Sequence, residues 1–301
     1  MRFLKCYGNI IFDGEYLNGK RNGKGKEYNE KGKLIFDGNY LNDLKSGNGK
    51  EYTQNKVLIY EGEYLKGLKN GKGKQYSDQK LVYEGEYLFD KIWNGKGYDK
   101  NGNIIYEINQ GNGKVKEFNY KGKLEFEGEY LKGQKIGKGK EFYSNGNLKF
   151  EGEYLNGKRN GKGKEYNYGN ELIFEGEYLN GEKIGKGKEF YSNGNLKFEG
   201  EYLNGKKWNG KGYDGLNNIA YELKNGNGAV KEYYSIGNLE FEGEYLNGEK
   251  NGLIKEYYSN GNLEFEGEYL NGTRNGKGKE YDKGGNIIFE GEYLDSLKVL
   301  N

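Results

Sequence analysis

The sequence lacks several residue types on which enzyme chemistry depends. It has no histidine, no proline, one methionine and one cysteine in 301 residues. Without histidine there is no imidazole general base, no Ser–His or Cys–His nucleophile pair and no His-ligated zinc. The single cysteine, Cys6, excludes an internal disulfide and a cysteine-rich metal site. We therefore expect no metal and no cofactor, and an enzyme is the least favoured class of function.

Long apolar segments are also missing. The mean hydropathy is −1.09, and nowhere do about 18 apolar residues follow one another, the length that a membrane-spanning helix needs. The first residues, MRFLKCYGNIIF, have no sustained apolar run of the kind found in signal peptides. These absences predict a cytoplasmic protein, and association with a membrane or the cytoskeleton stays open.

Low hydropathy alone would suggest disorder, but the aromatic content and the charge balance argue against it. Aromatic residues make up 16% of the chain, and 48 basic and 46 acidic residues leave a net charge of only +2. Disordered segments usually combine few aromatic residues with a high net charge. We therefore expect a folded protein with a thin core. The near-neutral charge also argues against a nucleic-acid partner.

A repeated phrase dominates what is present. FEGEYLNGKRNGKGKEY, which begins at Phe150, recurs with small changes along the whole chain, and most steps between copies are 24 residues. Two gaps each hold a degenerate copy, with Ile108 and Leu223 in place of a glycine. Repeats of this period are typical of arrays. We predict one domain over residues 1–301, an array of about thirteen units of 20–24 residues. The glycine of EGEY stands at Gly14, Gly38, Gly62, Gly85, Gly128, Gly152, Gly176, Gly200, Gly243, Gly267 and Gly291.

A longer period lies above the first. WNGKGYDKNGNIIYEINQGNGKVKEF, from Trp93, returns as WNGKGYDGLNNIAYELKNGNGAVKEY from Trp208, an offset of 115 residues. The offset indicates that a block of five units has been duplicated.

Each unit is predicted to be a β-hairpin. In Leu148–Leu155, apolar residues and glycine alternate with Lys and Glu, the period of a strand with one apolar face. Asn156–Gly161 is predicted to turn and Lys162–Tyr166 to return as a strand. The fold class is therefore all-β: an elongated single-chain array of hairpin repeats that forms an open, twisted antiparallel ribbon or half-pipe.

Glycine inside strands needs a reason, because it ordinarily weakens them. We expect Tyr or Phe rings of adjacent strands to lie over the glycine backbone, at positions such as Gly152 and Gly163. The opposite face would carry cross-strand ion pairs, such as Glu153 with Lys162 or Lys164, each contributing roughly 0.2–1 kcal/mol. The sequence leaves the register of these pairs open.

The string EGEYLNGKRNGKG resembles the MORN repeat, whose pattern runs roughly Y-x-G-x-W/Y-x-x-G-x-x-x-G-x-G. Another stretch, GLIKEYYSNGNL from Gly252, resembles the variant MORN units common in bacteria. The resemblance covers nearly the whole chain and implies a hairpin array that serves as an interaction module. The positions that match the pattern are Gly152, Tyr154, Gly157, Gly161 and Gly163.

The main functional hypothesis is a non-catalytic scaffold that binds a protein partner, with a homodimer as one form of that partnership. The aromatic face or an open end strand would make the contact. Two alternatives stay open. One is a peripheral binder of anionic phospholipid membranes, and the other is an antitoxin-like or immunity repeat protein, as some bacterial relatives are described.

The two tryptophans are the first candidate binding residues. Trp93 and Trp208 each precede a degenerate unit, in which Tyr106 and Tyr221 occupy equivalent positions. The hairpin there must be shorter, so a notch could form in which a partner docks. The other interpretation is that each tryptophan fills the space left by the missing residues, and it is favoured because buried aromatic residues more often serve packing than recognition.

The basic turns are the second candidate. Lys158, Arg159 and Lys162 represent a group that recurs in other units and could form a positive stripe along one edge. Such a stripe could bind anionic headgroups, with about 1 kcal/mol for each basic residue near the surface. The favoured interpretation is that these residues pair with the neighbouring glutamates and keep the edge soluble.

Overall fold

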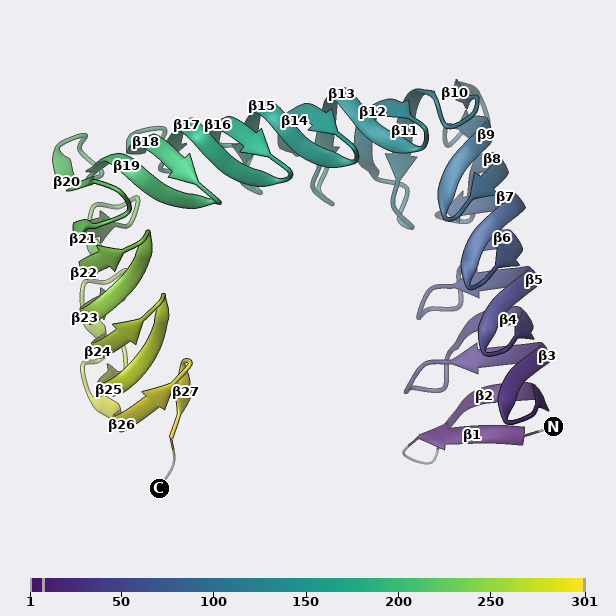
Figure 1. The fold of residues 1–301 in the computed structure, drawn as a ribbon, viewed down its shortest axis with the longest axis horizontal. Coiled ribbons are helices and arrows are strands. Elements are labelled where there is room, and N and C mark those ends of the chain that lie inside the picture. The colour runs from purple at the N-terminus through teal and green to yellow at the C-terminus, as the bar shows by residue number, and fades with distance from the viewer. Residues whose placement is uncertain (1, 7–8, 300–301) are drawn as a thin grey trace. The chain divides into compact units, whose positions relative to one another are not determined.

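The computed structural model describes residues 2–6 and 9–299, and in this part of the chain all regular elements are β-strands (Figure 1). Antiparallel pairing in sequence order joins them into three open sheets, which confirms the predicted all-β hairpin array. The first sheet contains β1 (Arg2–Cys6), β2 (Asn9–Leu17), β3 (Lys20–Tyr28), β4 (Leu34–Leu41), β5 (Leu44–Tyr52), β6 (Leu58–Leu65), β7 (Leu68–Ser77), β8 (Lys80–Leu88), β9 (Lys91–Tyr98) and β10 (Ile104–Ile108).

The other two sheets repeat the same arrangement. The second contains β11 (Gly113–Phe118), β12 (Leu124–Leu131), β13 (Gln134–Phe142), β14 (Leu148–Leu155), β15 (Lys158–Tyr166), β16 (Leu172–Leu179), β17 (Glu182–Phe190), β18 (Leu196–Leu203), β19 (Lys206–Tyr213) and β20 (Ile219–Leu223). The third contains β21 (Gly228–Tyr233), β22 (Leu239–Leu246), β23 (Glu249–Tyr257), β24 (Leu263–Leu270), β25 (Thr273–Tyr281), β26 (Ile287–Leu294) and β27 (Leu297–Lys298).

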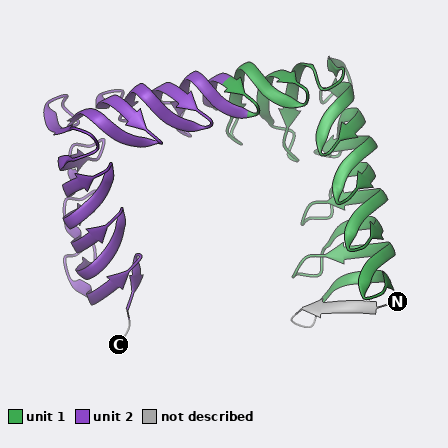
Figure 2. Ribbon diagram, in the orientation of Figure 1, with its two compact units in different colours: residues 1–148, 154–157 green, residues 149–153, 158–301 purple. Residues whose placement is uncertain are grey.

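The chain forms two compact units (Figure 2). Unit 1 comprises residues 1–148 and 154–157, and unit 2 comprises residues 149–153 and 158–301. Within each unit the hairpins lie side by side, and one break separates two sheets, between β10 and β11 in unit 1 and between β20 and β21 in unit 2. The single domain over residues 1–301 stays a prediction.

The turn inside each hairpin is tighter than the sequence predicted. Asn156 and Gly157 both have positive φ, 52° and 83°, the geometry of a two-residue hairpin turn. The return strand therefore begins at Lys158, and the prediction of a turn as far as Gly161 was wrong. Gly161 lies within the strand at φ 84°. In the next hairpin two residues of β17 lie between consecutive pairs with β16, so this glycine position serves a bulge.

A single layer of rings forms the core. Phe150, Phe174 and Phe198 are fully buried, and each is joined by a buried tyrosine of the following hairpin, as in the T-shaped pair Phe150–Tyr178 with centroids 5.3 Å apart. A methyl group on Gly163 would lie 2.5 Å from Cζ of Phe150 and 3.2 Å from Cε2 of Tyr178. The prediction that rings lie over bare backbone is confirmed.

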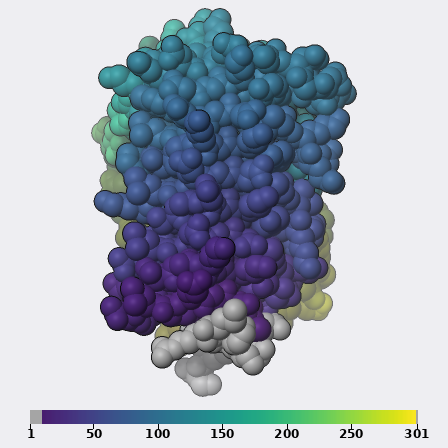
Figure 3. Space-filling model, turned by 90° about the vertical axis from the view of Figure 1, so that its right-hand side faces the viewer, coloured from purple at the N-terminus to yellow at the C-terminus, as the bar shows by residue number. Residues whose placement is uncertain are grey.

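Side chains of neighbouring hairpins contact one another at the surface. In the space-filling view, the side chains of successive hairpins of the first sheet meet along the face turned to the viewer (Figure 3). One face of each sheet carries the rings, and the other carries alternating lysine and glutamate side chains. These two faces position the candidate sites.

Candidate functional site

The Lys/Glu face is built from pairs between one hairpin and the next. The register places Lys162 opposite Glu177 and Lys164 opposite Glu175. Lys164 Nζ lies 3.5 Å from Glu175, and Lys188 and Glu199 repeat this pair at 2.8 Å in the next hairpin. The predicted cross-strand ion pairs are thus present, but the lysines meet a glutamate of the following hairpin. Because both partners are largely exposed, each pair contributes only about 0.2–1 kcal/mol.

A groove runs along this face in each unit. The groove of unit 1 crosses β4–β8 and has a volume of about 830 Å³. The groove of unit 2 crosses β20–β26 and has a volume of about 810 Å³. Facing glycine pairs such as Gly73–Gly85 and Gly278–Gly291 line both grooves, and lysines and acidic residues stand beside them. A glycine pair leaves a path without side chains between charged rows.

The two grooves differ in the polarity of their lining. At one position of each return strand unit 1 has Asn48 and Lys72, whereas unit 2 has Ala229 and Leu253. The Leu253 side chain is 78% exposed, although its neighbour Ile254 is buried in the ring layer. The groove of unit 2 therefore offers an apolar contact that the groove of unit 1 lacks.

The ring face carries a second set of charges. At the second position of most return strands a cation lies over the ring of its own hairpin, as Arg159 does 4.0 Å above the centroid of Phe150. Arg159 also pairs with Glu165, which Lys183 approaches to 3.5 Å from the next hairpin. In unit 1 Glu51 is shared in the same way between Lys45 and Lys69, at 2.8 and 3.5 Å. Each such glutamate links two consecutive hairpins.

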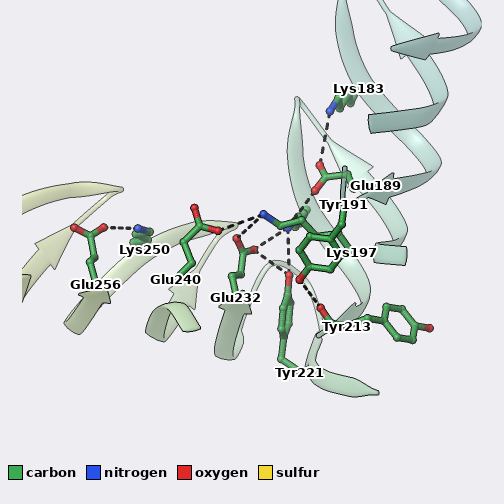
Figure 4. A network of polar contacts seen from close by, with 11 residues as sticks. Lys183, Glu189, Tyr191, Lys197, Tyr213, Tyr221, Glu232, Glu240, Lys250 and Glu256 are labelled. Atoms are coloured by element: carbon green, nitrogen blue, oxygen red, sulfur yellow. Dashed lines mark hydrogen bonds and ion pairs between the residues drawn. The ribbon is translucent and has the colours of Figure 1, made fainter. Parts of the chain in front are cut away.

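At the short hairpin β20–β21, the cations and glutamates of the ring face form a buried network (Figure 4). Lys207 Nζ lies 2.7 Å from Glu232 and 3.3 Å from Glu189, and the Tyr221 hydroxyl donates to Glu232 at 3.0 Å. Lys197 lies between Glu232 and Glu240, at 3.9 and 3.5 Å. The Lys207 and Glu232 side chains are only 12% and 14% exposed. Each charge therefore needs the other to offset the hydration that it loses on burial.

Opposite charges fix the protonation of this network. Burial alone would raise the pKa of Glu232, but the Lys207 and Lys197 ammonium groups outweigh burial and lower this pKa to about 2. Burial would lower the pKa of Lys207, but Glu189 and Glu232 hold it well above its ordinary value. Burial raises the pKa of the Tyr221 hydroxyl, and this residue stays neutral. The network is therefore fully charged near neutral pH and serves cohesion.

The short hairpin β10–β11 of unit 1 has the same backbone but fewer charges. Gln75 and Ile92 replace Glu189 and Lys207. Glu117, the counterpart of Glu232, accepts from the Tyr130 hydroxyl at 2.6 Å and lies 3.7 Å from Lys135. Tyr106 packs its ring against Gly97 as Tyr221 does against Gly212. Neither tyrosine ring is freely exposed.

The tryptophans occupy equivalent places in the two units. Each is half-buried in a return strand, and in each case it is the extra residue at a bulge, as between the pairs Glu201–Asn209 and Tyr202–Lys207. A methyl group on Gly111 would lie 2.9 Å from Cζ3 of Trp93, and the Trp93 carbonyl accepts from the Gly111 amide at 2.8 Å. Trp208 meets Gly226 in the same way. The indoles therefore lie against the tight turns of the short hairpins.

The three basic candidates point in different directions. Lys158 and Lys162 are exposed, whereas Arg159 is turned onto the ring face. The structure thus does not gather them into one stripe. Nor does one unit hold both tryptophans, since Trp93 and Tyr106 lie in unit 1 and Trp208 and Tyr221 in unit 2. Their role in binding stays a prediction.

Sequence reasoning missed Lys207, Glu232 and Leu253. A signal for Lys207 was present, because it replaces Ile92 directly before the otherwise identical string WNGKGY. Leu253 could have been found as an apolar residue at a position where most units have lysine.

Two further observations bear on the chemistry available. Among residues 2–6 and 9–299, no group of three or more His, Cys, Asp and Glu side chains is placed to hold a metal ion. Over the same residues, no helix has the length and apolar character that crossing a membrane requires.

Hairpins that stack on shared glycines and rings define a class of repeat protein. Comparison of the sequence with known families identifies this class. The MORN repeat matches residues 12–33, 36–56, 60–79, 150–168 and 265–287. The MORN repeat variant matches residues 135–156, 183–204 and 250–271. Together these segments cover more than half of the chain, which belongs to the MORN-repeat family, as the resemblance predicted. None of them includes either short hairpin.

Solved structures add only distant likenesses. A crystal structure of TcdB2-TccC3-Cdc42 aligns with 93% of this chain and 18% of its own, at 13% identity and a TM-score of 0.19. A Photorhabdus luminescens Tc holotoxin pore aligns with 96% of this chain and 18% of its own, at 12% identity and a TM-score of 0.21. The chain therefore spans less than a fifth of these proteins, and scores this low carry no argument. No curated protein matches the sequence.

Proposed function

We propose that this MORN-repeat chain is a non-catalytic scaffold that holds extended segments of a partner protein in the grooves of its Lys/Glu face. The observation that carries the proposal is the groove itself, which recurs in both units with a volume of about 800 Å³ and a glycine lining. The same lysines and glutamates repeat from hairpin to hairpin, so no single acid or base is set apart for a reaction.

The dimensions suit an extended segment. Successive hairpins are two strands apart, about 9.6 Å, and an extended chain advances about 9.9 Å in three residues. The backbone of a partner segment lying across the strands would therefore reach an equivalent site at every third residue, and because its side chains alternate, the same side of the segment would face every second site. Lysine and glutamate side chains beside the groove can donate to its carbonyl groups and accept from its amide groups.

The groove of unit 2 also specifies one kind of side chain. Leu253 and Ala229 offer apolar surface where other hairpins have lysine. An apolar side chain of the partner placed there would remove this surface from water at about 25 cal/mol for each Å² buried. We therefore expect segments that bind unit 2 to carry an apolar residue.

A displayed library of twelve-residue peptides, selected on the full chain, tests the proposal. We expect enriched peptides with an apolar residue and at least a tenfold loss of their affinity in the double variant Ala229→Lys/Leu253→Lys. Both changes install the residue of other hairpins, such as Lys138 and Lys162, so the fold should tolerate them. The matched control is Leu216→Lys, since Leu216 is 80% exposed in a turn outside the groove.

Equal binding by the double variant and the wild type would place the peptides elsewhere and refute this use of the groove. A selection that enriches no peptide would refute the proposal for short extended segments.

A further inference from the structure

Four consecutive hairpin tips of unit 1 expose an unusual number of apolar side chains. These tips, residues 17–20, 41–44, 65–68 and 88–91, are called the tip row here. Each begins with a leucine, and the side chains concerned are 36–58% exposed. Exposed apolar residues scattered singly need no explanation, but a continuous set does. The apolar members are Leu17, Leu41, Leu44, Leu65, Leu68, Leu88 and Phe89.

Backbone hydrogen bonds hold the tips in line. The amide of Asp43 donates to the Arg21 carbonyl at 3.0 Å. The amides of Gly67 and Asp90 donate in the same way to Lys45 and Lys69, at 2.8 and 2.9 Å. The two central tips are also closed by apolar pairs, Leu41 with Leu44 and Leu65 with Leu68. The tip row is therefore a regular ridge with a repeat of about 9.6 Å.

Most hairpins of unit 2 lack this apolar density. Their tips begin with the same leucine, but in three of them its closing partner is charged: Leu179 faces Glu182, Leu203 faces Lys206 and Leu246 faces Glu249. Leu270 faces Thr273, and the last hairpin has an apolar pair, Leu294 with Leu297. The turn needs no apolar residue at this position, since charged ones close it equally well. Leu44 and Leu68 are thus not explained by the fold.

The charges of the tip row alternate along it. Lys20, Asp43, Lys66 and Asp90 stand on the first, second, third and fourth tips. Asp43 is 3.6 Å from Arg21 Nε, and Asp90 accepts from the Lys69 amide at 2.8 Å, so both carboxylates are held at the tips. Lys91 shares the fourth tip with Asp90, and its stem lies along Gly133 of the following hairpin. Among the four residues named first, the order of signs is plus, minus, plus, minus.

We propose that the tip row binds the tip row of a second copy of this chain in antiparallel orientation about a twofold axis. The first tip then faces the fourth, and the second faces the third. Lys20 meets Asp90, Asp43 meets Lys66, and the two central leucine pairs meet each other. A second copy has the same repeat, so every tip finds a counterpart without any adjustment of spacing.

This surface is separate from the grooves, and either proposal can fail alone. The tip row uses the turns of β2–β9, whereas the groove of unit 1 is lined by residues in the middle of its strands. Peptide selection on the grooves does not depend on the oligomeric state.

Sedimentation velocity of the full chain across a concentration series tests the tip row. We expect a wild-type dimer, and at least a tenfold rise in its dissociation constant for Leu44→Glu/Leu68→Lys. These changes introduce residues found at equivalent positions, Glu182 and Lys206, so folding should be kept. The matched control Leu179→Lys/Leu203→Glu alters two exposed tip leucines of unit 2, places opposite charges against Glu182 and Lys206, and should leave the dimer intact.

Charge reversal tests the orientation. Lys20→Glu/Lys66→Glu makes the first three tips negative and should weaken the dimer more at low salt than at high salt. A wild-type chain that stays monomeric at high concentration, or a dimer indifferent to Leu44→Glu/Leu68→Lys, overturns the proposal. A monomer that binds neutral phosphatidylcholine vesicles through these leucines also overturns it, because the tips would then meet a lipid surface.

Discussion

The two short hairpins, β10–β11 in unit 1 and β20–β21 in unit 2, share a backbone but not a set of charges. Both follow a tryptophan that lies on a tight turn, Trp93 on Gly111 and Trp208 on Gly226. Unit 2 then adds the buried network of Glu189, Lys207 and Glu232, whereas unit 1 has neutral residues in two of these three places.

This difference shows which shared features accompany the end of the sheet and whether the ion network is required for it. The sheet ends at the same strand position in both units, and both units have the bulged tryptophan and the short turn. The ion network, which only unit 2 has, is not needed for the break. Its effect should instead appear in stability and in the response to pH.

The largest effect is expected when the network loses its central cation. Lys207→Ile leaves Glu189 and Glu232 facing each other with little water, and should lower the free energy of unfolding by about 3–5 kcal/mol. Urea denaturation measures it. The matched variant Glu189→Gln/Lys207→Ile has the composition of the first hairpin and should recover most of the loss. A loss below about 1 kcal/mol in the single variant would mean that the network is solvated.

The tryptophans should show nearly equal effects. Trp93→Ala and Trp208→Ala each remove a half-buried ring from a glycine turn and should cost about 2–3 kcal/mol, less than a fully buried tryptophan. Thermal or urea unfolding of the two variants provides the comparison. If either variant kept full stability but lost a partner, the indole would serve recognition.

Acid should affect the two hairpins unequally. The pKa of Glu232 is lowered to about 2 in the folded chain, against about 4.3 in an unfolded one. Its stabilising contribution is therefore present above about pH 4.3 and disappears as the pH falls toward 2. Unfolding free energies across this range should fall by roughly 1–3 kcal/mol in the wild type and less in Glu189→Gln/Lys207→Ile. Identical slopes in the two proteins would contradict the assignment.

The smallest effect is expected from building the network into unit 1. Ile92→Lys places a cation near Glu117, and Gln75→Glu supplies its second partner. The double variant should lie within about 1 kcal/mol of the wild type in urea, because gained attraction offsets desolvation. Hydrogen exchange of the β9 and β11 amides gives the free energy of local opening. A large decrease in this free energy would show that unit 1 cannot hold these charges.

The regular part of the fold follows from the sequence because a few residues encode it. Alternation in Leu148–Leu155 predicts the strand, and Gly163 predicts the ring that covers it. The register did not follow, because the two-residue turn at Asn156 and the bulge at Gly161 set the pairing within the hairpin, and the connection 167–171 sets which glutamate of the next hairpin meets each lysine. Such offsets depend on backbone angles that composition does not specify.

The candidate site was predicted less well. Trp93 and Trp208 were recognised as special, and the structure places them at the sheet breaks. An outward stripe that includes Arg159 was the less favoured interpretation, and the alternation that carries Glu165 inward also carries Arg159 onto Phe150 and into an ion pair with Glu165. The grooves require the three-dimensional proximity of several hairpins, which one repeat cannot show.

The sharing of each ring-face glutamate between two hairpins has an evolutionary consequence. A hairpin of this kind has one side that offers a carboxylate and another that offers a cation, as Glu165 and Lys183 do. Copies that keep both groups can therefore follow one another without a new complementary surface. A block of such hairpins, like the one that recurs here after 115 residues, can be repeated with the same ion pair at each joint.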